Sequence, residues 1–171
     1  EKSQGVLTCS AGNHGLAVAH GAEALGLKAT IVVARSASRT KVEAMGRYPV
    51  TVIERGATYD EAERAARRLE RETDSCFVSP YNDREVIAGQ GTIALELLDE
   101  IPELEALVIP VGGGGLVAGM AIAAKARNPR VKIYGVEPLA SPSMTKALEA
   151  GQLIEIKEEE TIADGLAGNV E

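Results

Sequence analysis

Four consecutive glycines at residues 112–115 are the part of this sequence with the clearest chemical potential. They follow an apolar stretch with β character and precede a helix-like run over residues 117–126. Because glycine has no Cβ, its backbone reaches positive φ values and can turn successive N–H groups toward one anion. A following helix adds the positive end of its dipole. The segment therefore predicts a site for a phosphate group.

A strand-to-helix turn without a ligand is the alternative explanation for these glycines. Each glycine costs roughly 0.5–1 kcal/mol relative to alanine through lost chain entropy, which a turn alone rarely requires. The segment lacks the Lys-Ser/Thr ending of a nucleoside-triphosphate loop and the spaced glycines of the dinucleotide fingerprint, which argues against ATP and NAD. The prediction also requires that side chains do not pack against the glycine bend and close it to a ligand.

A second loop with binding chemistry follows the first predicted strand, over residues 10–15. Ser10 and Asn13 offer short polar side chains, and the N–H groups that begin the next helix, over residues 16–25, favour a carboxylate. A helix cap formed by Ser10 or Asn13 is the alternative explanation. His14 has no acid or metal partner nearby in the sequence, so we expect it to be structural rather than a general base.

Composition narrows the partners and the compartment. With 18 basic and 25 acidic residues the net charge is −7, and without a basic cluster neither nucleic acid nor an anionic membrane is an expected partner. Cys9 and Cys76 are too few for a disulfide framework, which favours a reduced, cytoplasmic location. We expect both cysteines to lie at buried strand ends. No apolar stretch approaches the roughly 18 residues of a membrane span.

The two loops must be positioned by alternating strands and helices. Strands are predicted at residues 6–9, 30–34, 50–53, 76–79, 107–111 and 132–136. These strands are nearly continuous apolar runs, which is typical of parallel strands with helices on both faces. The fold class is therefore α/β, with a doubly wound, three-layer parallel sheet.

The regular alternation of strands and helices is interrupted near residues 80–83 by turn-forming residues, which predicts two lobes. The small lobe covers residues 1–82 and carries the serine-containing loop. Residues 83–171 form part of a large lobe that carries the glycines. Asn82 and Asp83 are capping residues for the helix predicted over residues 85–99. A ligand between the lobes would lie beyond the carboxyl ends of the parallel strands.

Taken together, the two loops resemble those of the fold-type II pyridoxal-phosphate enzymes, the tryptophan synthase β-like group. Threonine and serine dehydratases are the most similar members. The motifs that carry the resemblance are Ser-Ala-Gly-Asn-His-Gly at residues 10–15, Ile-Ala-Gly-Gln-Gly-Thr at 87–92, Pro-Val-Gly-Gly-Gly-Gly-Leu at 110–116, Gly-Val-Glu-Pro at 135–138 and Thr-Ile-Ala-Asp-Gly-Leu at 161–166. The resemblance covers essentially the whole chain.

The resemblance implies a role for each loop and pyridoxal 5'-phosphate as the cofactor. The residues implied to hold the cofactor phosphate are Gly112, Gly113, Gly114 and Gly115. Asn13 is implied to lie beside the pyridine ring and its 3-hydroxyl. The residues implied to bind the substrate carboxylate are Ser10, Ala11, Gly12 and His14.

The implied reaction removes the α-proton and then the β-hydroxyl of threonine or serine, and yields a 2-oxo acid and ammonia. Serine racemase or another fold-type II enzyme that replaces the β-substituent is the alternative within the family. A non-catalytic anion-binding fragment or module is the alternative from another class. The expected partner is a small amino-acid substrate, and the intact parent protein is expected to be a homo-oligomer.

Two features of the family pattern are missing. The lysine that forms the Schiff base, within a Ser-Phe-Lys-x-Arg-Gly-Ala type motif, is absent, so no catalytic residue is assigned; Lys2 lies too close to Ser10 to replace it. The residue that pairs with the pyridine nitrogen is absent as well, and we expect the chain to be a central fragment of such an enzyme, inactive alone. Serine-racemase-like members place a carboxylate metal ligand at Glu137, but Ser143 stands where they offer an aspartate. The sequence therefore favours a salt bridge or a helix cap for Glu137 over a divalent site.

Overall fold

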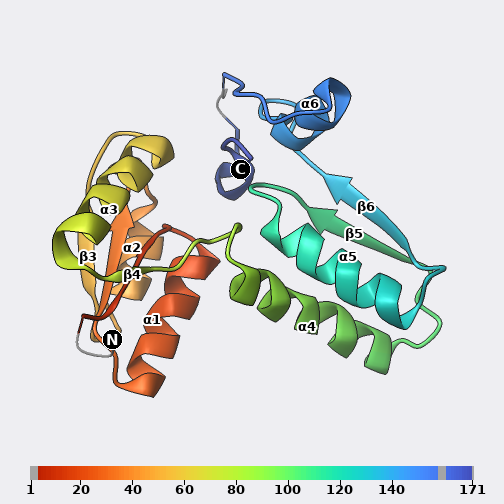
Figure 1. Ribbon diagram of the computed structural model, residues 1–171, viewed down its shortest axis with the longest axis horizontal. Helices are drawn as coiled ribbons and strands as arrows, with labels where there is room; N and C mark the ends of the chain where they lie inside the picture. Colours follow the sequence, from red (N-terminus) through yellow and green to blue (C-terminus); the bar gives the residue numbers. More distant parts are fainter. Residues whose placement is uncertain (1–3, 158–160, 171) are drawn as a thin grey trace. The chain divides into compact units, whose positions relative to one another are not determined.

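Strands and helices alternate along the chain, as the sequence predicts (Figure 1). The computed structural model describes residues 4–157 and 161–170. The chain divides into two units, Glu1–Pro80 and Tyr81–Glu171. The six predicted strands are all present, and they form a four-stranded and a two-stranded sheet, both parallel. The predicted α/β class is therefore confirmed.

The first unit is a sheet covered by helices on both faces. Its elements are β1 (Val6–Cys9), α1 (Asn13–Leu25), β2 (Ala29–Val33), α2 (Arg39–Met45), β3 (Thr51–Glu54), α3 (Tyr59–Thr73) and β4 (Cys76–Phe77). The strand order is β3-β2-β1-β4. Leu7 and Val32 pack against Ala62 of α3, whereas Ile31 packs with Met45 of α2 on the other face. This unit therefore has the predicted doubly wound, three-layer arrangement.

The two cysteines differ from each other in burial. Cys9 is fully buried at the end of β1, as predicted, whereas Cys76 is exposed and the prediction for it is wrong. The reason is the length and place of β4, which has two residues and, in the described part of the chain, lies at the edge of the sheet beside β1. An edge strand of this length leaves one of its side chains without a covering helix.

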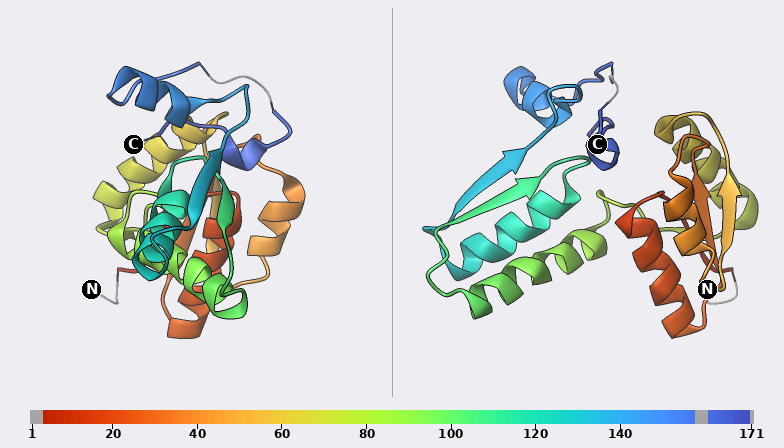
Figure 2. Two further views of the ribbon diagram at one scale, coloured as in Figure 1. Left: turned by 90° about the vertical axis from the view of Figure 1, so that its right-hand side faces the viewer. Right: turned by 180° about the vertical axis from the view of Figure 1, so that it is seen from behind.

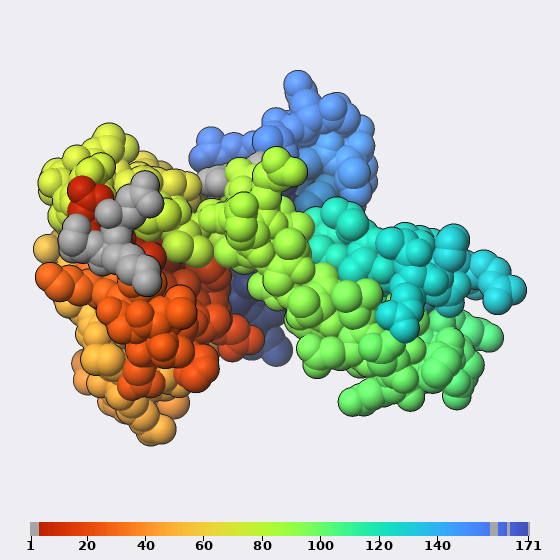
Figure 3. Space-filling view, turned by 60° about the horizontal axis from the view of Figure 1, so that its bottom comes forward, coloured from red at the N-terminus to blue at the C-terminus, as the bar shows by residue number. Residues whose placement is uncertain are grey.

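The second unit packs two helices on one face of a small sheet. Its elements are α4 (Arg84–Glu100), β5 (Ala106–Pro110), α5 (Gly115–Arg127), β6 (Lys132–Val136), α6 (Ser143–Ala150) and the 3-10 helix η1 (Asp164–Leu166). Helices α4 and α5 lie side by side along their length (Figures 2 and 3). Their core contains Leu98, Ile109 and Met120. On the other face of the sheet, Val108 and Tyr134 are 69% and 52% exposed.

Local capping explains where α4 begins. Asp83 is the N-cap residue, and its carboxylate accepts a hydrogen bond of 3.1 Å from the backbone N–H of Glu85, as the sequence predicts for Asp83. Across residues 4–157 and 161–170, no helix has the length and apolar character needed to cross a bilayer.

Candidate functional site

The glycine loop, residues 112–115, joins β5 to α5. Just before it, the N–H of Val111 donates to the carbonyl oxygen of Val136 at 2.9 Å, so the loop begins where pairing with β6 ends. Gly114 is the N-cap residue of α5 and has a φ of 94°, the left-handed conformation that favours glycine. The loop therefore stands at the positive end of a helix of 13 residues.

The backbone N–H groups of the glycine loop carry its binding chemistry. Among the residues that the structure describes, Gly112, Gly113, Gly114 and Gly115 have no hydrogen-bond acceptor for their N–H groups. N–H groups at a helix start that lack internal partners are a ready site for an anion. Phosphate binding by this loop stays a prediction, and its N–H groups are chemically suited to it.

Close packing, rather than unusual φ values, explains most of these glycines. A Cβ on Gly113 would stand 2.3 Å from Cγ of Tyr81, and a Cβ on Gly115 would stand 2.6 Å from Cα of Tyr81. A Cβ on Gly114 would stand 2.9 Å from Cε of Met144. Within the glycine loop, only Gly114 has a positive φ, so the expectation that the whole run exploits this freedom is wrong.

These contacts leave the binding groups of the loop unsatisfied. The atoms of Tyr81 and Met144 lie near the positions that a Cβ would occupy, whereas the N–H groups of the loop find no acceptor in the described part of the chain. The packing of Tyr81 and Met144 therefore leaves the N–H groups of the loop without a hydrogen-bond acceptor from the described residues, and a bound anion would provide one. Sequence reasoning missed both Tyr81 and Met144, because nothing in a single sequence links either residue to a glycine so far along the chain.

The serine loop, residues 10–15, follows β1 in the first unit and includes the first three residues of α1. Gly12 is the N-cap residue of α1 and provides no side-chain cap, and the Oγ of Ser10 accepts from the N–H of Gly12 at 3.2 Å. Asn13 is exposed as the first residue of α1. The helix cap by Ser10 or Asn13, considered as the alternative, is thus not observed. The first turn keeps N–H groups suited to a carboxylate.

The side chain of His14 points back toward the sheet. Its Nε2 lies 3.0 Å from Oγ1 of Thr8 and 3.2 Å from the carbonyl oxygen of Val78. Because the hydroxyl of Thr8 donates its one hydrogen to the Val78 carbonyl at 2.8 Å, it can only accept from His14, so Nε2 carries a proton. The Nε2 side of the imidazole is therefore held by the sheet, and a purely structural role for His14 stays a prediction.

Gly15, in the serine loop, and Cys9, directly before it, both have structural explanations. A Cβ on Gly15 would stand 2.4 Å from the carbonyl oxygen of Ser10, so glycine is required there by close approach. Burial, together with the smaller effects of the nearby carboxylates of Glu63 and Asp60, raises the pKa of the Cys9 thiol to about 12. Cys9 is thus a neutral packing group rather than a nucleophile.

Glu137 caps the N-terminus of α6. Its Oε1 accepts from the N–H of Met144 at 2.7 Å, and its Oε2 accepts from the N–H and Oγ1 of Thr145 at 2.8 and 2.6 Å. The cap role favoured by the sequence is therefore observed. Ser143 offers a hydroxyl where a carboxylate would be needed, and the described residues contain no group of three or more His, Cys, Asp or Glu that could hold a metal. The residues present do not fit a divalent cation.

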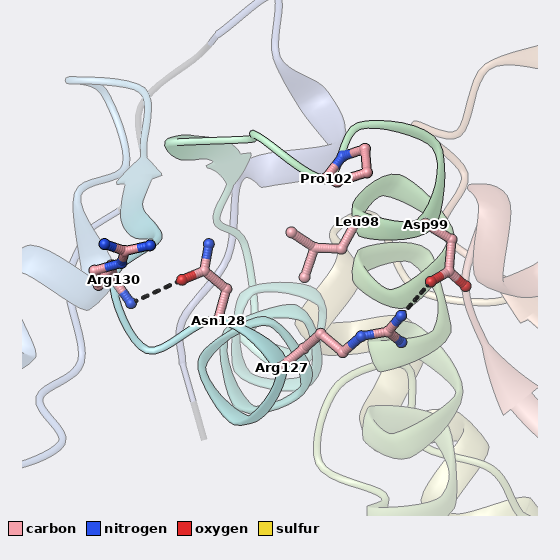
Figure 4. A pocket seen from close by; sticks show the side chains of 6 residues that line it. All are labelled: Leu98, Asp99, Pro102, Arg127, Asn128 and Arg130. Carbon is pink, nitrogen blue, oxygen red and sulfur yellow. Dashed lines mark hydrogen bonds and ion pairs between the residues drawn. The ribbon is translucent and has the colours of Figure 1, made fainter.

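A pocket of about 460 Å³ lies at the opposite end of the α4 and α5 pair from the glycine loop (Figure 4). It is lined by Leu98, Asp99, Pro102, Arg127, Asn128 and Arg130. The guanidinium of Arg127 is paired with the Asp99 carboxylate. None of the predicted site residues lines this pocket.

Comparisons with known proteins agree with the resemblance seen in the motifs. Residues 1–171 match the family described as "Pyridoxal-phosphate dependent enzyme". The chain is 44% identical to the L-threonine ammonia-lyase of Thermotoga maritima, with 98% of this chain and 42% of that protein covered. It is 42% identical to the serine racemase of Oryza sativa subsp. indica, with 97% and 49% covered.

Solved structures show the same similarity. Maize serine racemase matches with a TM-score of 0.91 and 39% identity, over 98% of this chain and 51% of that one. Threonine deaminase isoform 2 from Solanum lycopersicum matches with a TM-score of 0.90 and 38% identity, over 98% and 50%. The chain thus spans about half the length of the relatives that it matches.

Proposed function

Because this chain belongs to the family of pyridoxal-phosphate dependent enzymes, we propose that the protein is a threonine/serine ammonia-lyase that yields a 2-oxo acid and ammonia. The similarity to proteins named L-threonine ammonia-lyase supports this activity. The observation that carries the proposal is the glycine loop, whose N–H groups find no acceptor among the described residues at the start of α5.

The glycine loop fits the phosphate of pyridoxal 5'-phosphate. Its Cβ positions are filled by neighbouring atoms, so side chains there would displace either the loop or those neighbours. Four amide donors and the dipole of α5 would hold the dianion through Gly112, Gly113, Gly114 and Gly115. When bound, the cofactor supplies an electron sink for the charge left at the substrate Cα.

The serine loop is assigned to the substrate carboxylate and the cofactor ring. Ser10 accepts from the N–H of Gly12, so its hydroxyl hydrogen is able to donate to a carboxylate oxygen. Ala11 and His14 would contribute their backbone N–H groups. The imidazole of His14 is not assigned to the substrate, because it is hydrogen-bonded to Thr8. Asn13, exposed at the start of α1, would reach the 3-hydroxyl of the ring.

The remaining assignments concern the whole protein. No residue of this chain is assigned to form the Schiff base. The division of roles between residues 1–82 and 83–171, the homo-oligomeric state and the cytoplasmic location are proposed on the same basis. Both cysteines are free thiols, which supports a reducing compartment.

Serine racemase is a second candidate, favoured by the similarity to the racemases of rice and maize. It would use the same two loops, with the α-proton returned to the opposite face of the substrate instead of loss of the β-hydroxyl.

One experiment separates these activities. The protein in its full natural length is incubated with pyridoxal 5'-phosphate and either L-threonine or L-serine. Release of 2-oxobutyrate from threonine supports the ammonia-lyase. D-serine without oxo acid, detected by chiral chromatography, supports the racemase and overturns the lyase. Absence of both products overturns both activities and supports a non-catalytic binding module.

A further inference from the structure

We infer that Glu137 is a positioning residue for the glycine loop, acting through α6 and Met144 and without a metal ion. The inference rests on the proposed binding of phosphate by the glycine loop. It extends that proposal to a residue outside the loop, which would fix the loop conformation that its N–H groups need.

Glu137 caps the first turn of α6. Glu137 follows β6 directly, and its carboxylate accepts three hydrogen bonds of 2.6–2.8 Å from Met144 and Thr145. Pro142, the N-cap residue, provides no side-chain cap. A carboxylate from outside the helix therefore satisfies N–H groups of its first turn and complements the helix dipole.

Helix α6 in turn contacts the glycine loop. Met144, whose N–H is held by Glu137, places its Cε 2.9 Å from the Cβ position of Gly114. Gly114 is the N-cap residue of α5 and has the loop's one positive φ. Glu137 thus fixes the backbone of Met144, and the side chain of Met144 packs on Gly114, the glycine with the positive φ.

The carboxylate of Glu137 is already engaged by donors of α6, which argues against a metal at this position. Both carboxylate oxygens of Glu137 already face N–H or O–H donors. The neighbouring hydroxyl of Ser143 is fully buried and has no hydrogen-bond partner in the described part of the chain. A single carboxylate directed at amide donors and one serine hydroxyl fall short of the several oxygen ligands that a hard divalent cation requires.

The test compares variants of the full chain in their affinity for inorganic phosphate and for pyridoxal 5'-phosphate. Glu137→Ala removes the cap, and Glu137→Gln keeps one acceptor oxygen but turns an NH₂ group toward a donor. Loss of a cap is expected to raise the dissociation constant for phosphate about five- to tenfold in Glu137→Ala. A smaller rise is expected in Glu137→Gln. Glu149→Gln, on the same helix and paired with Lys146, is the matched control and should stay within about twofold.

Two further arms make the outcome specific. Met144→Ala should weaken phosphate binding, and its effect should not add to that of Glu137→Ala if both act through one contact. Addition of Mg²⁺ or of EDTA should leave the wild-type affinity unchanged. The amide resonance of Gly114 reports the loop directly, and urea unfolding of each variant separates loop positioning from general destabilisation.

The contrary results are distinct. Equal phosphate affinity in wild type, Glu137→Ala and Glu137→Gln overturns the positioning role while leaving the proposed site intact. If Mg²⁺ increases the phosphate affinity of the wild type but not that of Glu137→Gln, the metal-free mechanism is overturned. Failure of the wild-type chain to bind either probe overturns the proposed phosphate site itself and the positioning role with it.

Discussion

Replacement of Gly113 by alanine tests the packing of the glycine loop. The new Cβ would stand 2.3 Å from Cγ and 2.4 Å from Cδ1 of Tyr81. Carbon atoms in contact stand about 3.5 Å apart, so the ring or the loop must move by roughly 1 Å. Overpacking of this kind costs about 1–3 kcal/mol, and the stiffer unfolded chain returns about 0.4–1 kcal/mol. The expected net loss in the free energy of unfolding is about 1–2 kcal/mol.

Urea unfolding followed by circular dichroism measures this loss as a fall of about 0.5–1 M in the midpoint. Gly89→Ala is the matched control, because its Cβ meets no atom within 4 Å on α4 and should stabilise the protein by about 0.5–1 kcal/mol. In a Tyr81→Ala background the clashing ring atoms are gone, so Gly113→Ala should then cost less than about 0.5 kcal/mol. Wild-type stability of Gly113→Ala, or an undiminished cost in the Tyr81→Ala background, would refute the reasoning.

The structure predicts the results of four other perturbations. A thiol reagent at pH 8 should label exposed Cys76 and spare Cys9, whose thiolate fraction is about 10⁻⁴ there because its pKa is about 12; labelling of both in the folded protein contradicts this. That pKa lies above its ordinary value of 9.0, so the neutral Cys9 thiol contributes to the free energy of unfolding fully below about pH 9, and this contribution is lost as the pH rises toward 12. Urea midpoints measured across this range should fall in the wild type, and Cys9→Ala should abolish that part of the pH dependence. Gly119→Ala should lower stability by about 3 kcal/mol, since its Cβ would stand 2.1 Å from the Ile87 carbonyl oxygen, and thermal unfolding that matches wild type would contradict the α4 and α5 packing. Asp83→Ala should cost about 1 kcal/mol by loss of the α4 cap, with Asp83→Asn nearly neutral as its control.

Local pattern was enough to predict the strands and the helices α1, α4 and α5. The apolar run at residues 6–9 became β1 with the same bounds, because a central parallel strand is buried on both faces and shows it in its composition. Cys76 shows the limit of this reasoning, since an apolar run does not reveal whether a strand lies at a sheet edge.

The place of the glycine loop between a strand and a helix was predicted, but the reason given for its glycines is only partly correct. Conformational freedom is required at Gly114, whereas Gly113 and Gly115 are required by Tyr81. Such contacts depend on how distant segments fold together, and a single sequence carries no signal for them. The capping role of Glu137 was predictable as a chemical type, but its link to Gly114 through Met144 was visible only in the structure.

The most direct test of the central claim is a titration of the ¹⁵N-labelled 171-residue chain with inorganic phosphate, followed by the amide resonances of Gly112, Gly113, Gly114 and Gly115. These four resonances should shift in a saturable way, with Gly89 unchanged, and pyridoxal 5'-phosphate should compete for the same site. Amides of the glycine loop that do not respond while the chain is folded, or shifts confined to other residues, would contradict the account.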